Sequence, residues 1–140
     1  MKRITVREVE YIAFRLAKEL LSFNEPIPDF SSRFPNVLES CLAAPFQSFG
    51  GKSLYPAFIS KASILFYLMI KNHPFQNGNK RIAMTVLFVF LYKSNKWLKV
   101  DTQELYNFTV WVAGSPRGVK NQVVKAIEKF LTGHLQNIRR

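Results

Sequence analysis

The sequence contains little cysteine and little histidine. Cys41 is the single cysteine, so the chain cannot form an internal disulfide, which suits a reducing cytosol. We expect Cys41 to be a small buried apolar residue. The two histidines, His73 and His134, stand far apart and make no zinc-type ligand cluster with one cysteine. We expect His134, near the end of the last helix, to be solvated and to have no catalytic role.

Long apolar runs are also absent. The longest runs reach roughly half of the ~20 residues that a membrane-spanning helix needs. The N-terminus begins with Lys2 and Arg3 and continues with further charged residues, so it lacks the pattern of a secretory signal. We therefore expect a soluble, cytoplasmic protein with no membrane partner.

Acidic residues are scarce compared with basic ones. The chain has 9 Asp and Glu against 20 Lys and Arg, which gives a formal net charge of +11. Such a charge attracts anions, which include nucleotides, nucleic acids and acidic protein partners. A solvated basic surface with no specific partner has the same composition, so the charge alone does not choose among these classes.

The remaining composition is typical of a packed globule. With 140 residues, 48% of them hydrophobic, and 13 phenylalanines, residues 1–140 are expected to form one domain with a core that needs no disulfide or metal. Apolar residues recur at helical spacing along most of the chain, and no repeat or domain-scale linker interrupts them. We expect an all-α helical bundle of about six or seven helices, with room for one short β-hairpin.

Local signals predict where the helices begin and end. Thr5 with Glu8 forms a capping box at the start of the first helix, and the proline-containing residues 24–29 end it. Asp101 with Glu104 forms a second capping box. Three further predicted helices cover residues 36–43, 56–72 and 79–94, and prolines, glycines and polar turns separate them. The last predicted helix has Ser115 as its N-cap and Pro116 in its first turn, and it ends near Gly133.

Residues 73–81, with the sequence HPFQNGNKR, are a polar, cationic insert between the two most apolar segments, 64–70 and 82–92. Segments that are apolar on every side belong in the middle of a domain. A polar loop that joins two such helices must reach the surface at a fixed place with rigid walls. We therefore predict the functional site at this loop.

The helix that starts after Gly78 is expected to bind an anion. The first turn of a helix presents unpaired N–H groups and the positive end of the helix dipole. Gly78 has no side chain to block close approach, and Asn79, Lys80 and Arg81 lie in that first turn. Together these groups make a cradle suited to phosphate.

His73 stands at the other side of the same loop. A neutral imidazole can accept a proton, so beside a bound phosphate chain His73 is a candidate general base for an attacking hydroxyl. Phe75 is expected to anchor the loop in the core, and the amide oxygen of Asn77 is a candidate ligand of Mg²⁺. Each of these residues alone has an ordinary structural explanation, and their combination in one loop points to chemistry.

These residues resemble the signature of the Fic/Doc family. In that signature a His-x-Phe is followed by an acidic residue, a small residue, Asn, and then Lys-Arg or Gly-Arg. The ending Lys80-Arg81 resembles the Doc (death-on-curing) branch, which contains the toxins of toxin–antitoxin pairs. Residues 37–46 and Tyr55-Pro56 also resemble the Doc pattern, so the likeness covers most of the chain.

The resemblance implies an enzyme that uses ATP and Mg²⁺. Fic enzymes transfer AMP from ATP to a hydroxyl of a target protein. Doc binds the nucleotide the other way round and moves its γ-phosphoryl group to a threonine of elongation factor Tu, which stops translation. By this resemblance the chain is a Doc-like toxin and a protein kinase, with His73 as the base, Asn79, Lys80 and Arg81 at the phosphates, and position 77 facing the metal.

The resemblance also gives a role to the loop with Gly50, Gly51 and Lys52, which falls where the family has its target-docking flap. From the residues alone, segment 46–56 fits either a plain connector or a small hairpin.

The chain departs from the family pattern at three positions. Asn77 replaces the usual Asp or Glu, which keeps an oxygen but loses a full charge, so Mg²⁺ is expected to bind more weakly. Lys80 and Met84 stand where AMP-transferring enzymes have Gly and a second Arg, and both changes favour the kinase-like pose. No Ser/Thr-x-x-x-Glu inhibitory signature is present, so we expect a separate antitoxin, supplied in trans, to lay a helix in a groove.

Two alternatives remain open. The first is a Fic-type AMP transferase that modifies a protein hydroxyl. The second is an inactive basic module that binds nucleic acid or a protein through its charge. The sequence has no recognisable reading helix or stacking motif, which argues against nucleic acid as the partner.

Overall fold

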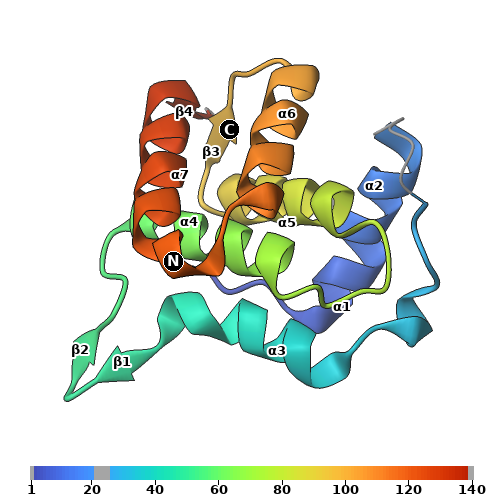
Figure 1. The fold of residues 1–140 in the computed structure, drawn as a ribbon, viewed down its shortest axis with the longest axis horizontal. Coiled ribbons are helices and arrows are strands. Elements are labelled where there is room, and N and C mark those ends of the chain that lie inside the picture. The colour runs from blue at the N-terminus through green and yellow to red at the C-terminus, as the bar shows by residue number, and fades with distance from the viewer. Residues whose placement is uncertain (1, 21–25, 139–140) are drawn as a thin grey trace.

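The computed structural model describes residues 2–20 and 26–138, and it has the expected all-α architecture. Two central helices, α4 (Phe58–Lys71) and α5 (Asn79–Lys93), pack against each other, and the other helices surround them (Figure 1). In the described part of the chain, no helix is both long enough and apolar enough to span a membrane.

Two of the surrounding helices, α6 (Thr102–Gly114) and α7 (Lys120–His134), are about as long as the central pair, and the other elements are shorter. The other helical elements are α1 (Val6–Glu8), the π-helical turn η1 (Val9–Ala13), α2 (Phe14–Leu20), α3 (Pro35–Ala43) and the 3₁₀ turns η2 (Phe30–Ser32), η3 (Ala44–Phe46) and η4 (Arg117–Val119). The strands are β1 (Ser48–Phe49), β2 (Lys52–Ser53), β3 (Lys96–Leu98) and β4 (Leu135–Asn137).

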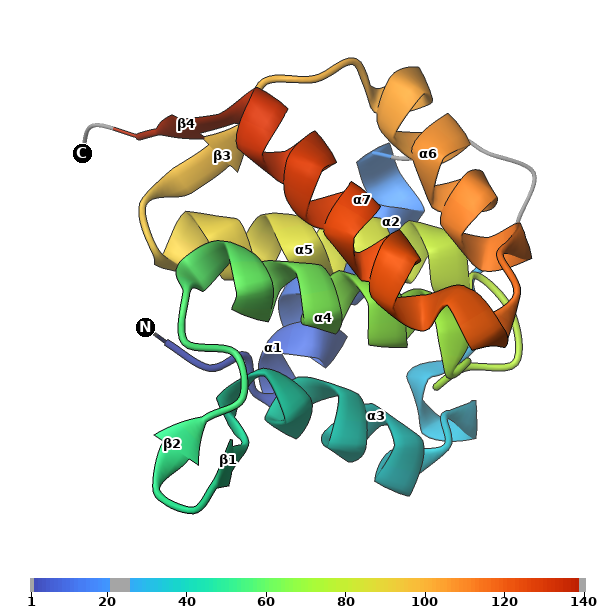
Figure 2. The same cartoon turned by 60° about the vertical axis from the view of Figure 1, so that its left-hand side comes forward.

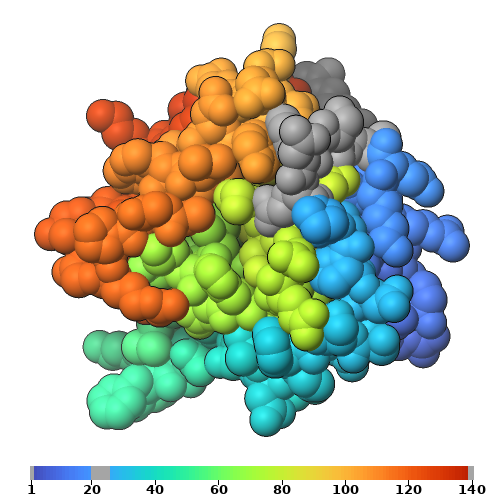
Figure 3. All heavy atoms as spheres, turned by 45° about the vertical axis from the view of Figure 1, so that its right-hand side comes forward, coloured from blue at the N-terminus to red at the C-terminus, as the bar shows by residue number. Residues whose placement is uncertain are grey.

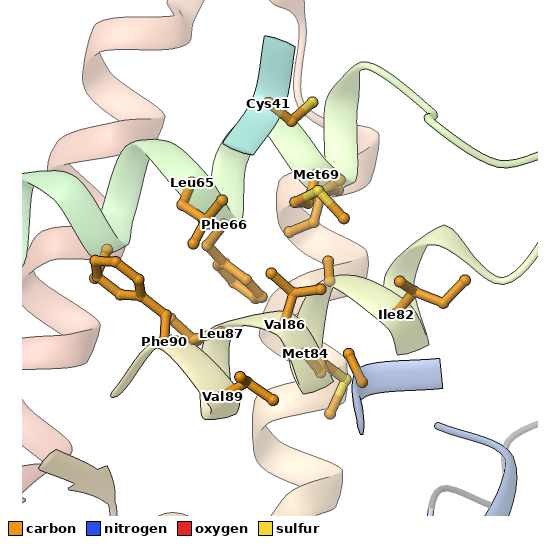
Figure 4. Packing of buried hydrophobic residues seen from close by; sticks show 14 of the residues in the cluster. Cys41, Leu65, Phe66, Met69, Ile82, Met84, Val86, Leu87, Val89 and Phe90 are labelled. Carbon is orange, nitrogen blue, oxygen red and sulfur yellow. The ribbon is translucent and has the colours of Figure 1, made fainter. Parts of the chain in front are cut away.

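The central helices are buried on nearly all sides, as their composition predicts. Figure 4 shows Phe66 of α4 pointing toward Val86 and Leu87 of α5, and all three side chains are fully buried. Cys41 of α3 is also fully buried, as expected, and burial raises the pKa of its thiol to about 11. A core that encloses two whole helices fixes the place where the loop between them emerges.

The N-terminal helix begins as predicted. The backbone N–H of Glu8 donates to Thr5 Oγ1 at 3.1 Å, and the Thr5 N–H donates to Glu8 Oε1 at 2.9 Å, so the capping box is confirmed. Part of the loop predicted to end this helix, residues 24–25, lies outside the described residues. Its described part, 26–29, has no regular secondary structure and leads into η2 through Asp29, whose backbone is extended.

Two predicted helix starts need correction. Asp101 occupies the N-cap of α6, but its side chain makes no capping hydrogen bond, so no capping box forms there. Ser115 is the C-cap of α6 and not the start of the next helix, since its Oγ donates to Val112 O at 2.6 Å. Pro116 accordingly precedes η4, and α7 begins only at Lys120.

The buried Lys71 explains why α6 ends where it does. Its Nζ donates to Ala113 O at 3.1 Å and to Ser115 O at 2.5 Å, which satisfies carbonyls at the C-terminal end of α6. Arg117 Nη2 donates to Lys71 O at 2.8 Å in return. These contacts tie the C-terminal end of α4 to the junction between α6 and α7.

His134 is not simply solvated. Its ring is half-buried, its Nδ1 lies 2.8 Å from Phe130 O, and it packs 4.4 Å from the Phe130 ring. The expectation of a solvated residue was therefore wrong, because the ring folds back along α7 and against Phe130.

The segment around Gly50 and Gly51 is a hairpin, not a plain connector. Strands β1 and β2 pair antiparallel, and both glycines have positive φ (60° and 80°), which a two-residue hairpin turn requires. The buried Nζ of Lys61 holds the base of this hairpin, since it donates to Pro45 O and to Ser53 Oγ at 3.2 Å each and also to Tyr55 O.

A second strand pair joins β3 to β4, antiparallel, near the C-terminus (Figure 2). The sequence did not predict it, because each strand has only three residues and no clear alternation of apolar and polar side chains.

Candidate functional site

The candidate site is the loop between α4 and α5, and it opens with a strained residue. His73 has φ 51°, in the left-handed region that side chains other than glycine seldom adopt. Such a conformation costs on the order of 1–3 kcal/mol and persists only where the surroundings hold it. The imidazole is exposed at the start of the loop.

Two contacts fix the loop just after His73. The Phe34 N–H donates to Pro74 O at 2.9 Å. The Phe75 side chain is only 1% exposed, and its ring lies 5.0 Å from that of Phe14 and 6.0 Å from that of Phe30. The residue predicted to anchor the loop thus lies among rings from α2 and η2.

Asn79 fixes the other half of the loop. Its Oδ1 accepts from the Phe75 N–H at 3.1 Å, and its Nδ2 donates to Phe75 O at 2.8 Å. Both atoms of the amide therefore bridge to the loop backbone, and one Nδ2 proton remains for another acceptor. In this structure Asn79 positions the loop.

Gly78 is required for a steric reason as well as for its backbone conformation. Its φ is 72°, and a Cβ at this position would lie 2.8 Å from Pro26 O and 2.9 Å from Ile27 Cδ1. The segment containing Pro26 and Ile27 therefore packs directly on the residue before α5. The sequence predicted the absence of a side chain here but not which segment fills the space.

A pocket of about 300 Å³ lies between this loop and α6. Four of its lining residues were predicted as site residues from the sequence, and three others (Ile70, Gln76 and Ala113) were not. The lining residues are Ile70, His73, Gln76, Asn77, Asn79, Lys80 and Ala113. Figure 3 shows the loop reaching the surface between the segment around η2 and the residues of α6 and α7. The pocket thus contains a proton acceptor, a lysine and the first turn of α5.

Arg81 is placed differently from Lys80. Its side chain is 7% exposed, its Nη2 donates to the backbone oxygen of Ala17 in α2, and it does not line the pocket. Successive helical residues point about 100° apart, so Lys80 faces α6 while Arg81 faces α2. The structure brings His73, Asn77, Asn79 and Lys80 together and leaves the Arg81 guanidinium outside the pocket.

The pocket offers oxygen ligands for a magnesium ion but no carboxylate. No Asp or Glu occurs in the sequence between Glu39 and Asp101. The side-chain oxygens in the pocket lining are the uncharged amide oxygens of Gln76, Asn77 and Asn79. In the described part of the chain, no three His, Cys, Asp or Glu side chains gather as a metal cluster. Mg²⁺ normally uses one or two carboxylates with substrate phosphates, so a Mg²⁺ ion bound in this pocket would need substrate phosphates as its main ligands.

The hairpin with Gly50, Gly51 and Lys52 lies at the opposite end of α4 from His73 (Figure 2). The 14 residues of α4 separate the two. At 1.5 Å per residue this is about 20 Å along the helix axis. The hairpin therefore does not line the pocket, and any target that contacts both must span that length.

A larger cavity lies elsewhere in the described part of the protein. It has a volume of about 480 Å³ and lies between the N-terminal helix, α5 and β3, with Ile12, Phe88 and Trp97 among its lining residues. Its charged residues include Glu8 and Lys93, which pair with each other at 2.7 Å. It contains no histidine, cysteine or hydroxyl nucleophile except the Tyr92 phenol, so we place the chemistry in the smaller pocket.

The comparisons with known proteins found a matching family. The model of the Fic/DOC family matches residues 3–91, which is more than half of the chain and includes the hairpin, α4, the loop and most of α5. No curated protein and no solved structure matches.

Proposed function

The chain belongs to the Fic/DOC family, whose members are generally nucleotide-transferring enzymes, and we propose that it transfers a phosphoryl group from ATP to a hydroxyl of a protein. One observation carries the proposal. The imidazole of His73, the side chain of Lys80 and the N-terminal turn of α5 line one pocket of about 300 Å³.

The reaction follows from these positions. The hydroxyl of the target enters beside His73, which accepts its proton as the hydroxyl oxygen attacks the γ-phosphorus. The bond from that phosphorus to the bridging oxygen breaks, and ADP leaves. Lys80 and the first-turn N–H groups of α5 stabilise the negative charge on the phosphate oxygens.

The residues of the pocket support phosphoryl transfer more than AMP transfer. Lys80 lines the pocket at the position where AMP transferases of the family have glycine. Met84 is fully buried, so position 84 brings no second cation to the site. The phosphate chain is then held at Lys80 and the helix tip, beside the base.

The biological part of the proposal rests on the resemblance. We propose that the protein is a Doc-like toxin that modifies elongation factor Tu and so inhibits translation, and that an antitoxin supplied in trans restrains it. The carboxylate-free pocket implies that Mg²⁺ enters with ATP.

ATP labelled at either the α or the γ phosphate tests the reaction. The protein and a bacterial lysate are incubated with each form, and retained label on protein is measured. Label kept only from the γ position supports the proposal, whereas label kept from the α position supports AMP transfer. His73→Ala is the control, and it should lower either transfer by about 10²-fold or more with an unchanged circular dichroism spectrum.

A lysate in which neither label is retained would favour the inactive binding module. In that case growth arrest on expression, if any, should also be the same for the wild-type protein and for His73→Ala.

A further inference from the structure

A row of uncompensated cations leads along α4 to the candidate site. Lys125 and Lys120 of α7 line a hollow of about 270 Å³ that reaches Ile64 of α4. Arg117 of η4 lines the next hollow, of about 400 Å³, which reaches Asn72. Asn72 precedes His73, which lines the candidate pocket, so the two hollows lie one after the other from Ile64 to the C-terminal end of α4, next to the base.

Two of the three cations, Lys120 and Arg117, contact residues of α4. The Lys120 ammonium lies 5.8 Å from the centre of the Tyr67 ring, and Arg117 Nη2 donates to Lys71 O at 2.8 Å. Lys120, Lys125 and Arg117 are exposed. We call these three residues the cation row.

Almost no acid balances the cation row. The 61 residues 40–100, which include the hairpin, α4, the loop and α5, contain no Asp or Glu, and Glu128 is the single acid that lines either of the two hollows. In the part of the chain that the structure describes, none of the three cations forms an ion pair with a carboxylate. Cations gathered without counter-charges attract an anionic partner.

Resting on the proposed function, we infer that the target hydroxyl is presented by an extended, acidic protein segment that lies along the cation row. The walls of the second hollow belong to α3 and η4, and those of the first hollow belong to α7, to Ile64 of α4 and to Tyr55. A chain in extended conformation fits between such walls. The segment binds by ion pairs and delivers its hydroxyl to His73.

Nucleic acid fits these features less well. Binding of single strands uses exposed aromatic faces on which bases stack. Tyr67, over which Lys120 lies, is 3% exposed, and Tyr55, which lines the first hollow, is half-buried, so neither ring offers such a face.

The helix length predicts the spacing of the acidic residues. Ile64 and His73 are nine positions apart, or about 13 Å along the axis. An extended chain rises about 3.3 Å per residue, so acids near Lys120 and Lys125 stand about four residues from the modified hydroxyl.

Synthetic peptides test the inference. Each fluorescent 12-residue probe has one Thr in an Ala/Gly background, with Asp at the third, fourth and fifth positions from it, on the N-terminal or the C-terminal side. Matched peptides have Asn at those positions. We expect one acidic peptide to bind about tenfold more tightly than its Asn partner in fluorescence anisotropy, as two or three ion pairs would give.

Charge reversal identifies the binding surface. Lys120→Glu with Lys125→Glu should abolish the preference for the acidic peptide. Both side chains are exposed, and an acid at position 120, in the first turn of α7, favours the helix dipole, so we expect folding to be preserved. Arg15→Glu with Lys99→Glu makes the same change of net charge at exposed positions outside the row and should keep the preference. Equal binding of the acidic and Asn peptides, or equal loss in both double variants, would overturn the inference.

Two further outcomes separate the inference from the proposed function. If the acidic peptide binds through the cation row but no label passes from ATP to any protein, the cation row stands and the transferase proposal fails. If label is transferred to protein but the acidic and Asn peptides bind equally, the transferase proposal stands and the cation row fails. A 12-nucleotide single-stranded RNA that loses binding in the Lys120 and Lys125 variant, while the peptides show no preference, would replace the acidic segment by nucleic acid.

Discussion

At the scale of single residues, the loop between α4 and α5 is held by contacts that leave His73 in a costly conformation. The backbone of Pro74 and the ring of Phe75 contact other parts of the chain, and the side-chain amide of Asn79 binds the backbone of Phe75 within the loop. Because these contacts fix both sides of the loop, the positive φ of His73 persists. The imidazole is therefore positioned before any ligand arrives.

Gly78→Ala should destabilise the protein more than Gly50→Ala. Both glycines have positive φ, so both variants strain the backbone by about 1 kcal/mol. A Cβ at Gly78 also meets Pro26 O at 2.8 Å, whereas at Gly50 it meets nothing within 4 Å. We expect the free energy of unfolding, measured with urea, to fall by about 2–3 kcal/mol in Gly78→Ala and by about 1 kcal/mol in Gly50→Ala. Equal losses of stability in the two variants would show that residues 26–27 can move to make room for the added Cβ.

Asn77→Asp should strengthen metal binding in the presence of nucleotide. The substitution places one full charge in a pocket that has no carboxylate. A titration of Mg²⁺ by calorimetry, with ATP bound, should show higher affinity in the variant. An unaltered titration would mean that residue 77 does not face the metal.

The sequence predicted much of this site because neighbours in one loop stay neighbours in space. It could not predict that Arg81 turns to Ala17 or that Asn79 binds the loop backbone, since both depend on partners that folding brings close. The wall residue Ala113 is missed for the same reason, because it comes from α6 and carries no chemical signal.

At the scale of elements, two buried lysines organise segments that hydrophobic patterns leave undetermined. Lys61 holds the base of the β1–β2 hairpin, and Lys71 holds the end of α6. In the sequence both stand in an apolar helix and look like ordinary surface lysines. The helices were predicted well because their periodicity is local, whereas Ser115 was misassigned because Lys71, far away in sequence, decides where α6 ends.

Lys61→Met should loosen the hairpin without unfolding the bundle. Methionine fills the space of the alkyl chain but leaves Pro45 O, Ser53 Oγ and Tyr55 O without this donor. Hydrogen exchange of residues 47–54 should become faster, by about tenfold or more for a loss of 1–2 kcal/mol. Lys52→Met, at an exposed position of the same hairpin, is the control, and identical exchange in both variants would contradict the role of Lys61.

The ion pair of Glu8 with Lys93 predicts a dependence on pH. Burial alone would raise the pKa of Glu8, but its hydrogen bonds with Lys93 and Thr5 outweigh burial and lower the pKa below 4.5. The folded state therefore gains stability that is fully present above pH 4.5 and is lost as the pH falls through the lowered pKa. The gain should be below about 1 kcal/mol, because the pair is partly exposed.

Glu8→Gln should remove this part of the acid sensitivity. Urea unfolding at pH 7 and at pH 3 should show a smaller difference between the two conditions for the variant than for the wild-type protein. A difference of the same size in both would mean that Glu8 does not titrate with a lowered pKa.

At the scale of the whole molecule, the acidic residues lie outside the segment that forms the central helices. The central helices α4 and α5 form a core that needs few ionised groups, and the segment from the hairpin to α5 carries no acid. The net charge of +11 was compatible with several anionic partners or with none, and it did not locate a binding surface. The sequence could not show that Arg117, Lys120 and Lys125 line the two hollows beside α4, because η4 and α7 are far from α4 in the sequence and pack against it only after folding.

The central claim is that ATP occupies the pocket that contains His73, and the histidine signals of the protein test it most directly. The chain has 2 histidines, and His134 lies on α7, away from the pocket lining, as an internal control. In a protein labelled with ¹⁵N at histidine, ATP with Mg²⁺ should shift the imidazole signals of His73 and leave those of His134 in place. Unchanged His73 signals at saturating ATP, or equal shifts of both rings, would contradict the claim.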